Sequence, residues 1–452
     1  MGAKGTLYQI TAKVVISGGP SQASPTTQVS ILASNGEILS TTDEIPGLAS
    51  GALPVTRPDG KLVITTFDTD QKVYLSVIDE NGAVQTFAPV DGLPVLQVSG
   101  PNGTVFTIAA KSAGSTQEAR LVILTADDVF STQLLDGIPG GYPVVAPDGT
   151  FYLGLLDPEK SEFSTLVIRP DLTSFSTNKI KGSASFPVII ASDGTAYQSI
   201  PTSAARTTVV HISGSTVDYR EAYGYPYTRP TAGPDGAIYY ATADGYILRI
   251  TGSSIAQSDS TGGEPKNVTQ IDSNGNAYLL SADYGTGIAR VTRFSADGST
   301  TTFTLNGQTV ESISAPPDGR VPHLSTLGPD GKLYVPLQDG SGYVVAVVGA
   351  SGLERTVAVN ARPVDSVVFG PSGTPYQVVV DIEEGSLTGT TAVVDLLTGV
   401  TSAVVDGLPR APQSNAIVAP VVFGPDGTGY LITLDESGTT TRGLVFGAAG
   451  DT

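Results

Sequence analysis

One short pattern recurs along the whole chain and limits what it can fold into. An apolar run leads into Pro-Asp-Gly or a close relative, and a second apolar run with an aromatic residue follows, as in residues 144–152, VVAPDGTFY. Asp-Gly and Asn-Gly pairs supply the positive φ angles that tight hairpins demand, so each copy predicts a β-turn between two strands. The spacing between copies runs from 39 to 56 residues. The anchor glycines are Gly5, Gly60, Gly103, Gly149, Gly194, Gly236, Gly275, Gly331, Gly373 and Gly427.

The third residue after each anchor glycine is almost always aromatic. Only Val63 breaks the series. We expect these rings to pack between neighbouring repeats, with the tyrosine hydroxyls reaching a polar edge, because aromatic stripes are usually part of a core. A ladder for stacking ligands is the alternative. The series comprises Tyr8, Phe106, Tyr152, Tyr197, Tyr239, Tyr278, Tyr334, Tyr376 and Tyr430.

A third apolar run and, in several copies, a second turn and a polar fourth run complete the repeat. Four strands in roughly 45 residues is the size of a β-propeller blade. No window shows a capped helical periodicity. The sequence therefore predicts an all-β fold, a β-propeller of about ten four-stranded repeats. Residues 1–452 would form a single domain of nine or ten blades in one ring, or residues 1–225 and 226–452 would form two five-bladed propellers in tandem.

The turn, the aromatic strand and an Asp at the end of that strand resemble the NHL repeat and its relatives, the SMP-30-type lactonases and the streptogramin lyases. The resemblance covers essentially the whole chain at the level of the repeat. It implies the fold and not the chemistry.

Composition narrows the partners and the site of action. The net charge is −19, which disfavours nucleic acid and anionic membranes as partners. No apolar stretch is long enough to span a bilayer, so we expect no membrane insertion. The chain has no cysteine, which excludes disulfides and thiolate chemistry. Low Lys and abundant Thr, Ser and Gly suit a secreted, extracellular or cell-envelope protein, although residues 1–4 lack the apolar run of a signal peptide.

An aspartate stands eight residues after the anchor glycine in seven of the ten repeats. That offset places it where the second strand of the repeat runs out, so all seven should share one rim. We interpret them as structural caps that accept backbone N–H bonds. An acidic rim that attracts cations is the alternative. These rim aspartates are Asp68, Asp157, Asp244, Asp283, Asp339, Asp381 and Asp435, and the exceptions are Lys13, Lys111 and Thr202.

Another aligned position, at the mouth of the expected central channel, varies from repeat to repeat. His323 begins the strand that leads to Gly331 and should stand at this mouth, where propellers commonly bind ligands. Variation of this kind suits a shaped binding surface as well as unconstrained loops. The candidate ligand-binding residues at the mouth are Tyr142, Phe186, Arg229, Lys266, Asn267, His323, Arg362 and Asp365.

No catalytic set is evident. The streptogramin lyases are thought to use His and Glu with a metal; only His323 matches that pattern, and the nearest Glu at the mouth is Glu264. The leading hypothesis is therefore a non-catalytic, exported binding or adhesion scaffold for a protein or glycan, with no cofactor. One alternative is a metal-assisted lyase or lactonase that uses a divalent cation at the mouth. Another is a structural spacer within a larger surface protein. The sequence leaves the oligomeric state open.

Overall fold

The computed structural model describes residues 6–16, 23–50, 54–113, 116–184, 186–252, 254–311, 324–382, 388–409, 420–435 and 441–447. The chain divides into two compact units. The first comprises residues 1–190 and 194–222, and the second comprises residues 191–193 and 223–452. The choice between one propeller domain and two stays a prediction.

The first unit contains the sheets of the first five repeats. Its strands are β1 (Leu7–Ile16), β2 (Ala23–Leu32), β3 (Ile38–Thr41), β4 (Ile45–Pro46), β5 (Leu48–Ala49), β6 (Val55–Thr56), β7 (Leu62–Phe67), β8 (Lys72–Ile78), β9 (Val84–Thr86), β10 (Val90–Asp91), β11 (Leu93–Ser99), β12 (Val105–Ala113), β13 (Thr116–Leu124), β14 (Phe130–Leu134), β15 (Ile138–Pro139), β16 (Val144–Val145), β17 (Phe151–Asp157), β18 (Glu162–Ile168), β19 (Ser174–Ser176), β20 (Ile180–Lys181), β21 (Ile189–Ile190), β22 (Ala196–Ser203), β23 (Arg206–Ser213) and β24 (Thr216–Tyr223).

The second unit contains the sheets of the last five repeats. Its strands are β25 (Thr231–Ala232), β26 (Ile238–Ala241), β27 (Ile247–Ile250), β28 (Ile255–Gln257), β29 (Gly263–Pro265), β30 (Gln270–Ile271), β31 (Ala277–Asp283), β32 (Ile288–Phe294), β33 (Thr300–Thr309), β34 (Thr326–Leu327), β35 (Leu333–Asp339), β36 (Gly342–Gly349), β37 (Gly352–Val359), β38 (Arg362–Pro363), β39 (Val368–Phe369), β40 (Pro375–Ile382), β41 (Gly389–Asp395), β42 (Val405–Asp406), β43 (Val422–Phe423), β44 (Gly429–Leu434) and β45 (Thr441–Phe446).

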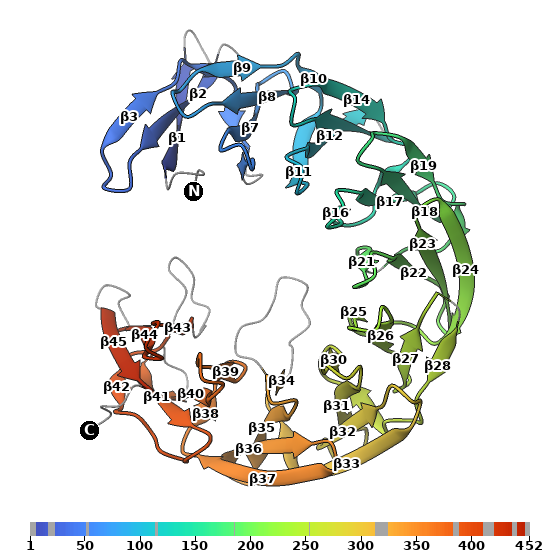
Figure 1. Ribbon diagram of the computed structural model, residues 1–452, viewed down its shortest axis with the longest axis vertical. Helices are drawn as coiled ribbons and strands as arrows, with labels where there is room; N and C mark the ends of the chain where they lie inside the picture. The colour runs from blue at the N-terminus through green and yellow to red at the C-terminus, as the bar shows by residue number, and fades with distance from the viewer. Residues whose placement is uncertain are drawn as a thin grey trace. The chain divides into compact units, whose positions relative to one another are not determined.

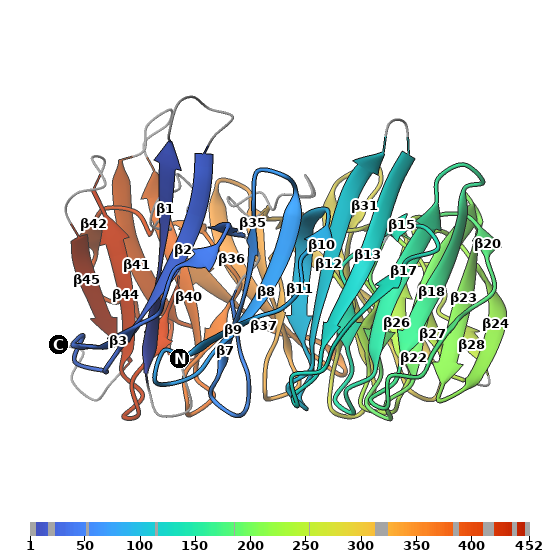
Figure 2. The ribbon, with the colours of Figure 1, turned by 90° about the horizontal axis from the view of Figure 1, so that it is seen from above.

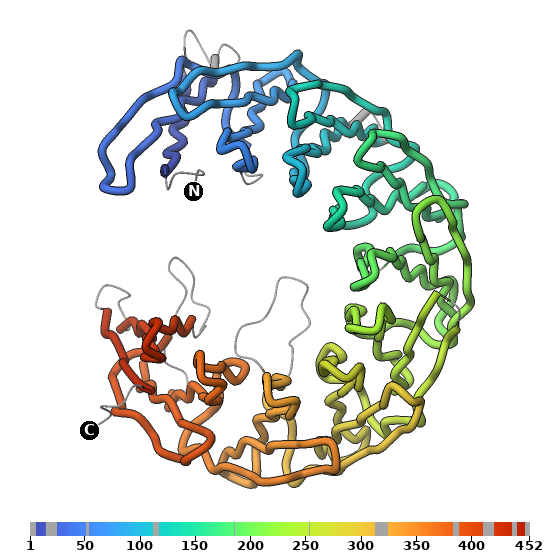
Figure 3. The backbone as a smooth tube through the Cα atoms, viewed as in Figure 1, coloured from blue at the N-terminus to red at the C-terminus, as the bar shows by residue number. Residues whose placement is uncertain are grey.

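Each repeat is an antiparallel meander. The sheet of the third repeat has the order β11-β12-β13-β14, and that of the sixth has the order β25-β26-β27-β28. Within each unit the sheets follow one another in chain order (Figures 1 and 3), and in the first unit their strands stand side by side (Figure 2). The seventh and eighth repeats share one sheet because the end of β33 pairs with β35. The all-β, β-propeller fold expected from the repeat is confirmed in these sheets.

The anchor turn has a more specific geometry than the sequence indicated. In the fourth repeat the Gly149 N–H donates to the Ala146 carbonyl at 2.9 Å, and the Ala146 N–H donates to Thr150 at 2.8 Å. Gly149 alone has a positive φ, of 90°, while Asp148 does not. Instead, the Asp148 carboxylate accepts the Thr150 N–H at 2.8 Å. The positive φ expected of the Asp-Gly pair is therefore supplied by the glycine alone, because this wider turn needs only one left-handed residue.

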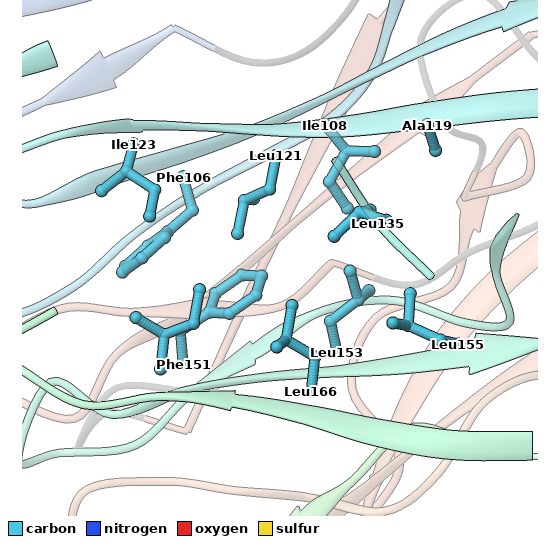
Figure 4. Close-up of a cluster of buried hydrophobic side chains, with 11 residues drawn as sticks. Phe106, Ile108, Ala119, Leu121, Ile123, Leu135, Phe151, Leu153, Leu155 and Leu166 are labelled. Carbon is cyan, nitrogen blue, oxygen red and sulfur yellow. The ribbon is translucent and has the colours of Figure 1, made fainter. Parts of the chain in front are cut away.

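The hydrophobic core lies between consecutive sheets. In the cluster drawn in Figure 4, Phe106 and Ile108 of the third repeat face Phe151 and Leu153 of the fourth. The rings of Phe106 and Phe151 stack with centroids 4.4 Å apart. Each such fully buried side chain stabilises the fold by about 1.5–3 kcal/mol, so a repeat gains most of its stability from its neighbours.

The aromatic series joins adjacent repeats at the anchor turns. The Tyr8 hydroxyl donates to the Gly60 carbonyl at 2.9 Å, and the Tyr239 hydroxyl donates to the Gly275 carbonyl at 3.0 Å. In both cases the acceptor is the anchor glycine of the next repeat. Burial, with the nearby Asp148 carboxylate, raises the pKa of Tyr152 to about 12. Tyr152 and Tyr239 are buried and Tyr8 is half-buried, as expected of packing residues, whereas Tyr430 of the last repeat is 47% exposed.

Candidate functional site

The first strand of most repeats is interrupted, and the mouth residues lie in or just before the interruption. Tyr142 lies between β15 and β16, Asn267 between β29 and β30, and Asp365 between β38 and β39. Phe186 precedes β21 and Arg229 precedes β25. His323 lies outside the described residues. The break frees these side chains from the alternation of a continuous strand, which is why the position varies between repeats.

The mouth residues separate into exposed and engaged side chains. Tyr142 is 71% exposed, and Arg229 is exposed as well. By contrast, the Asn267 amide donates to Ser325 Oγ at 2.9 Å. Asp365 accepts the Ser366 N–H at 2.8 Å, and its carbonyl accepts the Gln377 amide at 2.9 Å.

The half-buried Phe186 forms a contact equivalent to that between Asp365 and Gln377. Its carbonyl accepts the Gln198 amide at 2.8 Å. Gln198 and Gln377 both stand four residues after an anchor glycine, so the same bond holds the first strand in the fifth and ninth repeats. Asn267, Asp365 and the Phe186 backbone therefore take part in bonds that fix the broken strand.

Three rim aspartates accept hydrogen bonds from their own loops. Asp68 accepts the N–H groups of Asp70 and Lys72, both at 2.9 Å. Asp157 accepts the Lys160 N–H at 3.2 Å. Hydrogen bonding by the Lys160 side chain, opposed by desolvation and supported by the Lys160 N–H, lowers the pKa of Asp157. This contact resembles an Asx turn at the loop between the second and third strands.

Asp283 shows the most extensive pattern of this kind. It accepts the N–H groups of Gly285 and Thr286 at 3.0 Å and the Arg290 guanidinium at 2.7 Å. Hydrogen bonds from the backbone of Thr286 and Gly285 lower the pKa of Asp283, helped by the Thr286 hydroxyl and the Arg290 charge.

At two positions of the aspartate series the residue is a lysine, and each lysine forms an ion pair. Lys13 pairs with Glu44 at 3.0 Å. Lys111 pairs with Asp91 at 3.2 Å, and Asp91 also pairs with Lys72. Hydrogen bonds from Lys72 and Lys111 lower the pKa of Asp91. The residue at this position is thus matched to the charge of its neighbours.

The sixth and seventh repeats meet at a group of side chains that we call the Glu264 junction; it consists of Tyr227, Asp244, Glu264, Lys266, Asp283 and Tyr284. Glu264 accepts the Tyr227 hydroxyl at 2.7 Å and pairs with Lys266 at 2.6 Å. Partial desolvation, with the charges of Glu264 and Asp244, raises the pKa of Tyr284, although this side chain is 66% exposed.

The two strands of the Glu264 junction approach each other closely at Gly263. Gly263 pairs with Asp283 and Glu264 with Ala282. A Cβ added at Gly263 would lie 2.3 Å from the Ala282 carbonyl oxygen. Gly137 and Gly182 occupy the equivalent position in the fourth and fifth repeats, and an added Cβ there would also meet a backbone carbonyl, at 2.8 and 2.3 Å. Glycine at this position lets the first strand approach the second.

The eighth and ninth repeats meet differently, around a pocket of about 780 Å³ that we call the Arg362 junction. Val359 and Val380 are buried in its floor, and Tyr343 is half-buried in its wall. Two rim aspartates and one mouth residue come together at the polar surface of the pocket. These are Asp339, Asp381 and Arg362, all exposed, and Ser341 and Asn360 line it beside them.

The charged groups of this pocket differ from the rim residues described above in having no partners. Among the described residues, the side chains of Asp339, Asp381 and Arg362 form no hydrogen bond and no ion pair. The two carboxylates and the guanidinium therefore face the pocket with their hydrogen-bonding capacity unused. A ligand that supplies complementary groups would satisfy them.

Sequence reasoning named Arg362 and both aspartates but did not bring them together. It assigned Arg362 to the mouth and the aspartates to structural capping. The available signal was the residue before Arg362: Ala361 stands where the fourth, fifth and seventh repeats have glycine. In the ninth repeat pairing begins only at Arg362, opposite Val380.

The remaining rim aspartates and the other histidine add no further cluster. Asp244 is exposed, and Asp435 follows β44. His211 lies edge-on to Tyr197, with ring centroids 5.2 Å apart. Among the described residues no group of three or more His, Cys, Asp or Glu side chains could hold a metal ion. The lyase or lactonase hypothesis, which depends on His323, stays a prediction.

The described part of the chain contains no helix that is long and apolar enough to cross a membrane.

Comparison with known proteins gives neither a family nor a chemistry for this chain. No family model matches the chain, and no curated protein sequence matches it. A catalytically inactive virginiamycin B lyase from Staphylococcus aureus, solved with quinupristin, is 13% identical over 75% of this chain and 96% of its own, with a TM-score of 0.29.

Two further solved structures show the same level of similarity. The β-propeller domain of the Trilobed protease from Pyrococcus furiosus is 11% identical over 66% of this chain and 92% of its own, with a TM-score of 0.33. Dipeptidyl peptidase 4 from Porphyromonas gingivalis is 9% identical over 86% of this chain and 65% of its own, with a TM-score of 0.42. Similarity at this level concerns the fold alone.

Proposed function

We propose that this protein is a non-catalytic binding scaffold that captures a peptide ligand at the Arg362 junction. The observation that carries the proposal is the pocket itself, where two carboxylates and a guanidinium have no partner among the described residues. Elsewhere on the rim, Asp283 and Lys111 are engaged by their own repeat or its neighbour, while Asp244 is exposed and lies outside the pocket. Unused polar groups around a concave, partly apolar surface are typical of a binding site.

The mixed charge of the pocket favours a peptide over a neutral glycan. A glycan made of hydroxyl groups could hydrogen-bond to Asp339, Asp381 and Arg362, but it would cover their charges without compensating them. A peptide can place basic and acidic groups against both signs and rest apolar side chains on Val359 and Val380. Glycan binding is the competing outcome of the experiment below.

The experiment uses a peptide array and a glycan array, each probed with the purified, labelled chain. We expect the wild type to bind peptides, and the triple variant Asp339→Asn, Arg362→Gln, Asp381→Asn to lose that binding. Asp244→Asn is the matched control, because it makes the same change at the same position of the sixth repeat, outside the pocket.

Each outcome has a distinct meaning. Peptide binding that survives in the triple variant would move the site elsewhere on the molecule. Binding to glycans alone, lost in the triple variant, would keep the pocket and change the ligand class. Arrays that stay silent with every variant would count against the binding function. The melting temperatures of the variants should agree within a few degrees, because exposed residues without partners contribute little to stability.

A further inference from the structure

We infer that the Arg362 junction recognises zwitterionic ligands, namely short peptides with a free ammonium group and a free carboxylate, an inference that rests on the proposed function of this pocket. The ammonium group is held by Asp339 and Asp381, and the carboxylate is held by Arg362. The three side chains line one pocket, but they are far enough apart that no ion pair forms between them.

The separation of the unlike charges is the first argument. Ion pairs form readily elsewhere on this surface, as between Arg290 and Asp283 at 2.7 Å or Lys332 and Glu354 at 2.6 Å. Arg362 has two aspartates around the same pocket and pairs with neither. A ligand with both charges can bridge the space between them, and it gains a charge-assisted hydrogen bond at each end.

The chemistry of the two ends is the second argument. A guanidinium presents a planar fork of N–H donors that matches a carboxylate bidentately. Carboxylates are acceptors only, and two of them suit the three donors of an ammonium group. With one cation and two anions, the pocket favours a ligand that carries at least one positive charge.

The floor supplies the third argument. Val344, Ala361 and Ile382 line the pocket and are half-buried, and the buried Val359 and Val380 line it with them. Such a surface suits aliphatic side chains. A volume of about 780 Å³ falls in the range of sites for small ligands. Leucine, dileucine and trileucine each carry both charges and aliphatic side chains. The distance between the two charges increases along this series.

The test measures the binding of leucine, dileucine and trileucine to the full chain by isothermal titration calorimetry. For the length that binds best, N-acetylation removes the ammonium group and C-terminal amidation removes the carboxylate. We expect each modification to weaken binding roughly tenfold, the value of one charge-assisted hydrogen bond.

The variants assign each end of the ligand. Arg362→Gln should lower the affinity for the free peptide to the affinity for its C-terminal amide. N-acetylation should still weaken binding to this variant. Asp339→Asn with Asp381→Asn should abolish the effect of acetylation and leave that of amidation. Asp244→Asn should bind all probes as the wild type does. A role of these residues in folding alone would not produce this crossed pattern.

Two results would overturn the inference. One is equal binding of the free, acetylated and amidated peptides, or no heat from any leucine probe. The other is binding of the neutral sugar maltotriose that depends on the same three side chains. The second result would overturn the zwitterionic ligand but would still agree with a binding scaffold. The array experiment tests the scaffold function separately.

Discussion

The Glu264 junction joins the sixth and seventh repeats, and the Arg362 junction joins the eighth and ninth at equivalent positions, yet Glu264 and Asp283 have partners and their counterparts have none among the described residues. Position for position, Gly263 corresponds to Ala361, Glu264 to Arg362, and Asp283 to Asp381. In the first junction Glu264 pairs with Lys266, and Asp283 is bound by its loop and by Arg290. In the second, the corresponding charges have no described partner and surround a pocket.

The contrast shows that two repeats can keep the same pairing of their strands while their charged side chains differ in partners. The register of pairing is the same in both junctions: Glu264 lies opposite Ala282, and Arg362 opposite Val380. What differs is the set of side chains at these positions: Ala361 replaces Gly263, Arg362 replaces Glu264, and Val364 and Ile382 stand where the first junction has Lys266 and Tyr284. The glycine allows the ladder to start one residue earlier, whereas the ladder that begins at Arg362 leaves Ala361 in the pocket wall.

The largest effect on this comparison should come from Gly263→Ala. The added methyl group would lie 2.3 Å from the Ala282 carbonyl oxygen, so the first strand must shift. We expect the free energy of unfolding to fall by about 1–3 kcal/mol, as for other overpacked sites. Denaturant titration measures it.

Gly285→Ala is the matched control for this change. It lies in the same repeat and its added Cβ would meet only the Asp283 carboxylate, at 3.6 Å. A loss of stability as large in Gly285→Ala as in Gly263→Ala would contradict the close approach of the two strands.

Substitutions of charged residues should have smaller effects on stability, and these effects should differ between the two junctions. Glu264→Gln removes the ion pair with Lys266 and the charge that accepts the Tyr227 hydroxyl. The Glu264 side chain is 41% exposed, so screening limits the expected loss of stability to about 1 kcal/mol. Asp339→Asn, without a described partner, should change stability by less than about 0.5 kcal/mol. Equal losses in the two variants, measured by the same titration, would remove the distinction between the junctions.

The smallest effect should appear in the pH dependence of the free energy of unfolding. The folded-state pKa of Asp283 is lowered by the backbone of Thr286 and Gly285, so its ionised form is favoured by folding. Its contribution to stability is present above the unfolded pKa and is lost as the pH falls through the folded pKa. Asp283→Asn should therefore cost stability at about pH 7 and much less at about pH 3. A stability difference between variant and wild type that does not shrink in acid would show that these bonds do not depend on the carboxylate charge.

Much of the fold could be read from the spacing of residues, and part of the site could not. The anchor glycines fix turns because only glycine takes the left-handed conformation there at no cost, and the aromatic three residues later falls on a buried face because strands alternate. The mouth position was harder to interpret, since the first strand breaks where Asn267 and Asp365 lie, and hydrogen bonds to distant residues decide their roles. The aspartate series looked uniform, although Asp283 and Asp381 differ completely in their partners.

The sequence by itself determined the all-β class, the four-stranded repeat, the turn at each anchor glycine and the position of the rim aspartates. These features follow from local conformational preference and from alternation along a strand, which each repeat carries within itself. The tertiary structure decided which charges find partners and where a pocket remains. Arg362, Asp339 and Asp381 come from different strands of two repeats, and their meeting depends on how closely one strand packs against the next.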